Sequence, residues 1–190
     1  YHPALVESLA PIVSPMVAAA RLLRHRHGAD LRIVFIGPCI AKKGECYSAT
    51  LPGDLDEVLT FVELERLFAL RGVAAEKCPP RDFDPPHAGQ GALFPISRGL
   101  LQAADIDEDL MTGFVVATDG HTNFTSAIRE FESGDLNARL LEILACNGCI
   151  MGPGIDNRAT LFSRRSRVAQ YVSRRQADLD ASQWEREMAC

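Results

Sequence analysis

The sequence lacks several features that define whole classes of protein. None of its 190 residues belongs to an apolar run long enough to cross a membrane, and no signal peptide is recognisable. It also lacks an excess of positive charge. The formal net charge is −5, which argues against a nucleic-acid-binding surface as the main activity. We therefore expect a cytoplasmic protein with reduced thiols and with neither nucleic acid nor membrane as its partner.

The composition is that of an ordinary globular domain. Apolar residues make up 47% and charged residues 24% of the chain, which excludes a disordered or collagen-like protein. A chain of this length can bury a core without disulfides, so its six cysteines need another explanation: metal, redox chemistry or core filling. We expect one domain over residues 1–175 and a tail or linker over 176–190. Because the chain begins at Tyr1 without Met, we also expect missing neighbouring segments.

Hydrophobic patterning predicts strands that alternate with helices. We predict strands at 31–36, 58–59, 113–118 and 140–145, and helices at 5–26, 61–70, 97–104, 122–131 and 158–175. Thr60 and Glu63 form a capping-box pattern at the start of one helix. This alternation indicates an α/β fold, with a mostly parallel sheet of about four strands and helices on both faces. The first strand is almost continuously apolar, which predicts that both its faces are covered.

Cysteines follow two of the predicted strands. Cys39 comes after the first strand, and Cys146 and Cys149 come after the fourth, while Asp119 and His121 follow the third. In an open parallel sheet, ligands bind beyond the carboxyl ends of the strands. We therefore expect three thiols at one edge of the sheet, where thiolates make a soft-metal site of the iron–sulfur or zinc type.

The pair Cys146 and Cys149 is spaced so that both thiolates can hold one metal ion or cluster. Gly148 allows the backbone to turn sharply between them. A buried cysteine pair and a thioredoxin-like dithiol are the alternatives. Metal or cluster binding is favoured because the motif follows a strand instead of opening a helix.

Two lysines accompany the first cysteine. Lys42 and Lys43 lie three and four residues after Cys39. Lysines this close lower the pKa of a thiol and would neutralise an anionic cluster, and their ammonium groups can donate hydrogen bonds to an anionic ligand. A lysine pair alone is usually solvated surface, so only its proximity to Cys39 suggests a function.

Other candidate residues have no assigned chemistry. His87 lies in a proline- and glycine-rich loop over 76–96 and is interpreted as exposed or structurally bonded. His121 is interpreted as a residue at a helix start. Cys46 and Cys78 are interpreted as structural, Cys190 is left open, and Trp184 has no visible partner in a polar tail.

Two cysteine motifs resemble signatures of the iron-only (FeFe) hydrogenases. The run VFIGPCIAKKGE over 34–45 is similar to the second signature of that family, and LEILACNGCIMG over 141–152 is similar to the third. The segment LAPIVSP over 9–15 resembles the stretch after the first signature. The resemblance covers nearly the whole chain, to about residue 171, and implies one lobe of the hydrogenase fold.

The resemblance implies a cofactor and roles for four residues. Cys39, Cys146 and Cys149 match positions that hold a 4Fe–4S cluster, and the last of these also bridges to a diiron subsite with CO and cyanide ligands. Together these groups form the H-cluster. Lys42 matches the lysine that hydrogen-bonds a cyanide ligand, which makes it the catalytic residue. The implied activity is the reversible formation of H2 from protons and electrons.

The chain also departs from the family pattern. The first signature, which supplies a further cluster cysteine, would precede Tyr1, so the resemblance implies a missing N-terminal cluster-binding region and an inactive fragment. The third signature has two residues between its cysteines instead of three. Gly37 and Leu144 replace methionines, and Ile40 replaces a threonine.

These departures resemble a sensor-type branch, often fused to signalling domains, more than a fast enzyme. They imply H2 or redox sensing, an electron-transfer partner and a C-terminal signalling domain. The alternative is a non-catalytic iron–sulfur or zinc-binding regulatory module that kept the hydrogenase scaffold.

Overall fold

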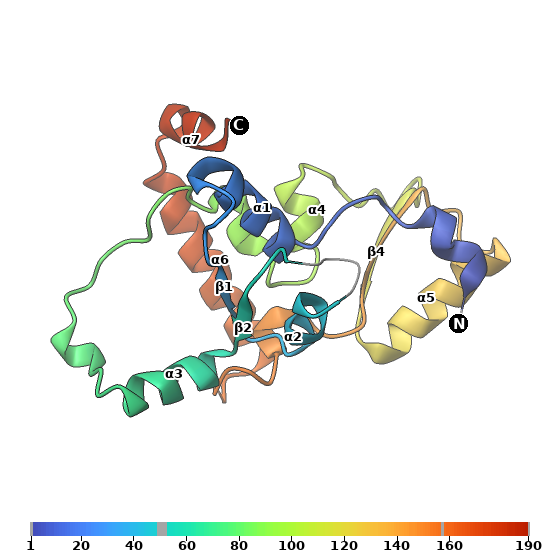
Figure 1. Cartoon of the computed structure of the whole chain (residues 1–190). Coiled ribbons are helices and arrows are strands. Elements are labelled where there is room, and N and C mark those ends of the chain that lie inside the picture. The colour runs from blue at the N-terminus through green and yellow to red at the C-terminus, as the bar shows by residue number, and fades with distance from the viewer. Residues whose placement is uncertain (1, 49–52, 157, 190) are drawn as a thin grey trace.

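The structure is a computed structural model and describes residues 2–48, 53–156 and 158–189. Its strands are β1 (Val34–Ile36), β2 (Glu57–Leu59), β3 (Val115–Asp119) and β4 (Leu140–Leu144). Its α-helices are α1 (Pro15–His27), α2 (Ala41–Cys46), α3 (Phe61–Leu70), α4 (Gly99–Ala103), α5 (His121–Ser133), α6 (Leu161–Ala177) and α7 (Ala181–Met188). The 3-10 helices are η1 (Pro3–Ser8), η2 (Ala75–Lys77), η3 (Gly89–Leu93) and η4 (Cys149–Met151). Helices and strands alternate as predicted, so the α/β class is confirmed (Figure 1).

The strands pair in parallel, but in two sheets of two strands instead of one sheet of about four. Strand β1 pairs with β2, with Phe35 opposite Val58, and β3 pairs with β4, with Ala117 opposite Glu142. Strand and helix alternation predicts parallel neighbours because each crossover returns the chain in the same direction. It does not determine whether two such pairs share a hydrogen-bond ladder, and β1 and β2 are only three residues long.

Helix α1 forms a hydrophobic core with the first sheet. Val17 and Val58 are fully buried where the helix crosses the strands. The other buried members of this cluster are Met16, Ala20, Ile33, Cys46 and Leu55. The helix begins at Pro15 and not at residue 5 as predicted, because residues Pro3–Ser8 form the separate η1 and residues 9–14 are not helical. The Ser14 side chain makes no capping hydrogen bond.

The second face of β1 is open. Val34 and Ile36 point to this face because they alternate with Phe35 along the strand, and their side chains are 50% and 39% exposed. The prediction that both faces of β1 are covered is therefore wrong for the described residues. A continuous apolar run shows that both faces of a strand could be buried, but it does not show that both are covered. Here α1 packs on one face of β1.

Helix α5 packs on the β3–β4 sheet, at the other end of the molecule (Figure 1). The N-terminal η1 lies beside this unit, and His2 Nδ1 lies 2.5 Å from Glu132 Oε2 of α5. A second buried cluster joins η3, η4 and α6. Its members are Leu93, Ile96, Ile150 and Val172.

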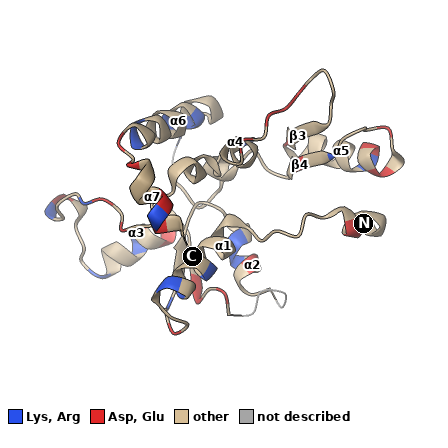
Figure 2. Ribbon diagram, turned by 90° about the horizontal axis from the view of Figure 1, so that it is seen from above, with Lys and Arg blue, Asp and Glu red and all other residues tan. Residues whose placement is uncertain are grey.

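Two helices follow the second cysteine motif. Helix α6 corresponds to the helix predicted at 158–175 and carries several arginines, which mark its surface in Figure 2. Residues 181–188, within the segment predicted as a tail or linker, form helix α7. The domain boundary at residue 175 stays a prediction. None of the helices in the described ranges is both long and apolar enough to cross a membrane.

Candidate metal centre

The loops that follow β1, β3 and β4 are joined by backbone hydrogen bonds. Gly154 N, beyond the second cysteine motif, donates to Pro38 O beside Cys39 at 2.9 Å. Gly120 N, directly after β3, donates to Cys146 O at 3.2 Å. The three strand ends selected from the sequence therefore meet, although they belong to two separate sheets.

Two glycines allow the cysteine motifs to touch. A Cβ atom on Gly152 would lie 2.3 Å from Pro38 O, and one on Gly154 would lie 2.8 Å from the same oxygen. Contacts of that length do not occur for real Cβ atoms. Gly152 has a φ of −61°, which any residue can adopt. The requirement at this position is therefore close approach of two backbones, not an unusual dihedral angle.

Gly148 shapes the turn between Cys146 and Cys149. Its φ of +89° lies in the region that favours glycine, and a Cβ there would lie 2.9 Å from Pro95 O. Ile150 N donates to the same Pro95 oxygen at 3.2 Å. Cys149, the first residue of η4, is thus held by a turn that packs on the 95–97 segment.

The three thiols differ in exposure, and two of them influence the third. Cys39 and Cys149 are half-buried, Cys146 is exposed, and all three are free thiols. Burial raises the pKa of the Cys149 thiol, and the nearby Cys39 and Cys146 raise it further. Lys42 acts in the opposite direction and lowers the same pKa. The structure therefore brings Cys39, Cys146 and Lys42 within electrostatic range of Cys149.

The two lysines have different contacts. Lys42 Nζ lies 2.5 Å from Glu45 Oε2 within α2, and its side chain is 19% exposed. Lys43 Nζ instead donates to Val58 O at 2.9 Å and pairs with Glu63 Oε2 at 2.9 Å. Lys43 therefore connects α2 to β2 and α3, and Lys42 is the lysine that influences Cys149.

The potential metal ligands at this site are thiols. Over residues 2–48, 53–156 and 158–189, no three His, Cys, Asp or Glu side chains converge closely enough to hold one metal ion. A structural zinc site needs four such ligands in a tight tetrahedron. A 4Fe–4S cluster is held by thiolates at separate iron atoms, and thiols are the ligands that iron–sulfur chemistry prefers. Three free thiols beside a lysine are consistent with that group.

Among the remaining sequence candidates, Asp119 and His121 flank Gly120 beside Cys146, while Cys46 and Cys78 have contacts of their own. Cys46 is buried in the α1 core, and Cys78 is exposed with its Sγ 3.5 Å from Ala74 O. His121 is exposed at the start of α5. Asp119 accepts a hydrogen bond from the Asn123 side chain through its carbonyl. Cys190 lies outside the described residues.

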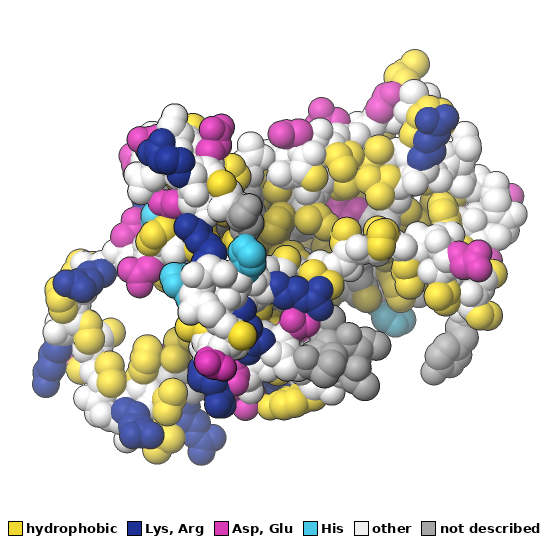
Figure 3. All heavy atoms as spheres, turned by 45° about the horizontal axis from the view of Figure 1, so that its top comes forward, with side chains coloured by type: hydrophobic (Ala, Val, Ile, Leu, Met, Phe, Trp, Pro, Cys, Tyr) yellow, Lys and Arg dark blue, Asp and Glu magenta, His cyan; other side chains and the backbone are white. Residues whose placement is uncertain are grey.

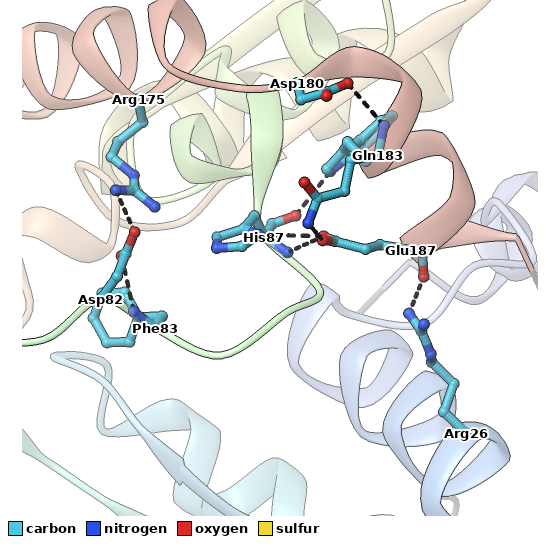
Figure 4. A network of polar contacts seen from close by, with 9 residues as sticks. Arg26, Asp82, Phe83, His87, Arg175, Asp180, Gln183 and Glu187 are labelled. Carbon is cyan, nitrogen blue, oxygen red and sulfur yellow. Dashed lines mark hydrogen bonds and ion pairs between the residues drawn. The ribbon is translucent and has the colours of Figure 1, made fainter.

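His87 is structurally bonded, which is one of the two arrangements predicted for it. Its Nδ1 lies 3.2 Å from Glu187 Oε2 in α7, within the network of Figure 4. Trp184, expected to lack a partner, donates from Nε1 to His87 O at 2.9 Å. The expectation for Trp184 is wrong because its partner lies 97 residues away, where local sequence gives no signal.

Glu142 in β4 has a partly buried carboxyl that the sequence analysis did not single out. Its Oε2 is buried and has no hydrogen-bond partner among the described residues. Burial raises the pKa of this carboxyl, while Arg98 lowers it. The available signal was a single acidic residue at the centre of an otherwise apolar strand.

Two pairs of parallel strands whose following loops carry three free thiols define an α/β domain with cysteines gathered at the strand ends. The family described as iron only hydrogenase large subunit, C-terminal domain, matches residues 1–153. The chain therefore belongs to the iron-only hydrogenase family, as the two cysteine motifs predicted.

Known relatives agree with this assignment. The chain is 33% identical over 95 residues to the NADP-reducing hydrogenase subunit HndD of Solidesulfovibrio fructosivorans, a match that covers 46% of this chain and 15% of that protein. Among solved structures it is similar to an [FeFe]-hydrogenase HydA(deltaEFG), with a TM-score of 0.61 and 21% identity over 87% of this chain. An apo [FeFe]-hydrogenase HydA1 variant from Chlamydomonas reinhardtii has the same TM-score and 20% identity over 88% of this chain. The chain spans 61% of the length of each of these two structures.

Proposed function

We propose that this chain supplies three thiolate ligands, Cys39, Cys146 and Cys149, to the 4Fe–4S cluster of an H-cluster-type site. The observation that carries the proposal is the contact between the two cysteine motifs, where Gly154 N donates to Pro38 O beside Cys39, with Lys42 close enough to lower the pKa of the Cys149 thiol. The family assignment supports it, because both motifs lie within the matched residues 1–153 and resemble two family signatures in the same order. Reduced thiols also fit a cytoplasmic protein.

The residues around the thiols would bind and orient the cofactor. The Lys42 ammonium, held by Glu45, can donate a hydrogen bond to an anionic ligand beside Cys149. The close packing at Gly152 and Gly154 keeps the two ligand-bearing loops at a fixed separation. When bound, an H-cluster supplies the reversible chemistry that interconverts H2 with protons and electrons.

A larger protein would complete the site. The chain covers only part of the length of its relatives, and its three cysteines leave one cluster ligand to be supplied. We place that ligand in an N-terminal region of the same protein, with an electron-transfer partner beyond it. This chain by itself is then expected to give no H2 turnover in a gas-chromatographic assay, and measurable H2 evolution would contradict this.

A sensing role is the form of this function that the packing favours. Gly37 stands where catalytic relatives carry methionine, and a Cβ there would lie 2.8 Å from the Phe35 ring. The space for a methionine side chain is thus filled by that ring. Together with Ile40, Leu144 and the shortened cysteine spacing, this favours H2 or redox sensing coupled to a C-terminal signalling domain.

Metal analysis after anaerobic reconstitution distinguishes the cluster from its alternative, a zinc-binding regulatory module. The longer protein that contains this chain is incubated with iron and sulfide, or with zinc, and both metals and acid-labile sulfide are measured. We expect iron and sulfide in equal amounts with a thiolate-to-iron absorption band. Zinc binding without sulfide would contradict the proposal and support the zinc module.

A further inference from the structure

Helix α7 is docked by polar contacts from two distant parts of the chain. Glu187 is 9% exposed, accepts from His87 N at 3.4 Å, and lies 3.2 Å from His87 Nδ1. Arg26 of α1 donates to the Glu187 carbonyl, and Gln183 donates to Glu187 Oε1 at 2.9 Å (Figure 4). The helix therefore ties α1 to the loop that precedes η3.

Trp184 places its ring on the first residue of η3. A Cβ on Gly89 would lie 3.2 Å from three atoms of the indole, and the indole N–H donates to His87 O two residues earlier. A side chain larger than glycine would push the ring away. Helix α7 thus contacts η3 directly through one aromatic residue.

The segment at the other end of η3 supports Cys149. Pro95 O accepts from Ile150 N, and the same oxygen lies 2.9 Å from the position that a Cβ of Gly148 would take. Leu93, Ile96 and Ile150 are buried together with Val172 of α6. The turn at 146–152, here called the Cys149 loop, therefore packs against residues 93–97.

The order of helix α7 rests on its docking to the rest of the chain. The helix has eight residues, and isolated helices of that length are marginal in water. We propose that docked α7 positions the Cys149 loop through η3, with Trp184 as the positioning residue. Release of α7 would loosen η3 and expose the Cys149 thiol. This coupling reaches beyond cluster binding to the control of one ligand by the C-terminal helix.

Thiol alkylation on the whole chain without metal tests the coupling. Iodoacetamide labelling of each cysteine is followed by mass spectrometry in the wild type, in Trp184→Ala and in Arg186→Ala, whose side chain is exposed on the same helix. We expect Trp184→Ala to label Cys149 about tenfold faster, because local opening becomes easier. Exposed Cys146 and buried Cys46 should keep their rates, and Arg186→Ala should match the wild type.

Trp184→Phe is the second variant, since it keeps a ring on Gly89 and loses the hydrogen bond to His87. It should label Cys149 at an intermediate rate, and this result is needed if Trp184→Ala does not fold. An unchanged Cys149 rate would overturn the proposal. Equal acceleration of Cys46 and Cys149 would also overturn it, because general loss of stability would explain both. The readout needs no cluster, so it is independent of whether the protein binds iron.

Discussion

At the scale of single residues, the site depends on two glycines, because their lack of a Cβ atom lets two backbones approach closely. Gly152 and Gly154 allow the second cysteine motif to lie against Pro38, next to the cysteine of the first. The thiols contribute chemistry, but the glycines fix the distance between the two loops that carry them. Lys42 and Lys43 are adjacent but differ in their contacts. Lys42 lowers the pKa of the Cys149 thiol, and Lys43 bonds to Val58 of β2 and Glu63 of α3.

Gly152→Ala is predicted to separate the two cysteine motifs. The added methyl group would lie 2.3 Å from Pro38 O, and backbone atoms cannot yield without moving a loop. We expect a loss of about 1–3 kcal/mol in the free energy of unfolding, as for overpacked cores. Urea unfolding measures it.

Gly44→Ala is the matched control, because a Cβ there meets no atom within 4 Å and Gly44 lies inside α2. Alanine is the better helix former, so we expect equal or higher stability. A Gly152→Ala protein as stable as Gly44→Ala would contradict the close-approach argument.

At the scale of elements, the Glu63 carboxylate connects the start of α3 to α2. Glu63 accepts from Thr60 N at 2.8 Å, Thr60 Oγ1 accepts from Glu63 N at 3.2 Å, and the capping box predicted from the sequence is confirmed. The same carboxylate pairs with Lys43 of α2. These hydrogen bonds lower the pKa of Glu63 from 4.5 to about 2, the bond from Thr60 N being the largest cause.

The contribution of Glu63 to stability should depend on pH. Because its pKa is lowered on folding, the contribution is complete above pH 4.5 and is lost as the pH falls to about 2. We expect Glu63→Ala to unfold at a lower temperature than the wild type at pH 6, with the difference shrinking toward pH 2. Thermal unfolding followed by circular dichroism measures this.

Glu65→Ala serves as control for the Glu63 experiment, since Glu65 is exposed on the same helix. Its unfolding temperature should stay close to that of the wild type at pH 6. Added salt should reduce only the part of the Glu63 effect that comes from Lys43, because the pair is partly exposed. A difference between wild type and Glu63→Ala that grows on acidification would be incompatible with the assigned hydrogen bonds.

At the scale of the whole molecule, much apolar surface is open. Figure 3 shows hydrophobic side chains gathered over the middle of one face, and β1 exposes Val34 and Ile36. Contiguous apolar surface of this kind is typical of an interface. It agrees with the finding that the chain spans about three fifths of similar solved structures.

Polar replacement of the open β1 face should reduce self-association. The double variant Val34→Thr and Ile36→Thr keeps two β-branched residues in the strand and removes exposed apolar surface. We expect less light scattering at high protein concentration and a change in unfolding free energy of about 1 kcal/mol or less. Val58→Thr, at a fully buried position of β2, is the contrasting control and should destabilise the protein strongly. Unchanged association in the double variant would show that another surface causes it.

The order of elements could be predicted because it rests on local patterns. Alternating strands and helices, the Thr60 cap and the cysteines after β1 and β4 were all readable in the sequence. The division into two sheets was not, since hydrogen bonding between strand pairs is a long-range property. The docking of Trp184 on His87 was missed for the same reason. The family resemblance selected Lys42, but charge and spacing alone did not separate it from Lys43, whose contact with Glu63 only the structure shows.

The most direct test of the central claim is the iron content of single cysteine variants of the longer protein that contains this chain. Cys39→Ser, Cys146→Ser and Cys149→Ser are reconstituted anaerobically beside Cys78→Ser, whose cysteine is exposed and lies outside the proposed site. Iron, sulfide and the electron paramagnetic resonance signal of the reduced cluster are measured. The account predicts that each of the first three variants loses most of its iron and that Cys78→Ser keeps the wild-type content. Wild-type iron content and an unchanged signal in the first three variants would contradict it.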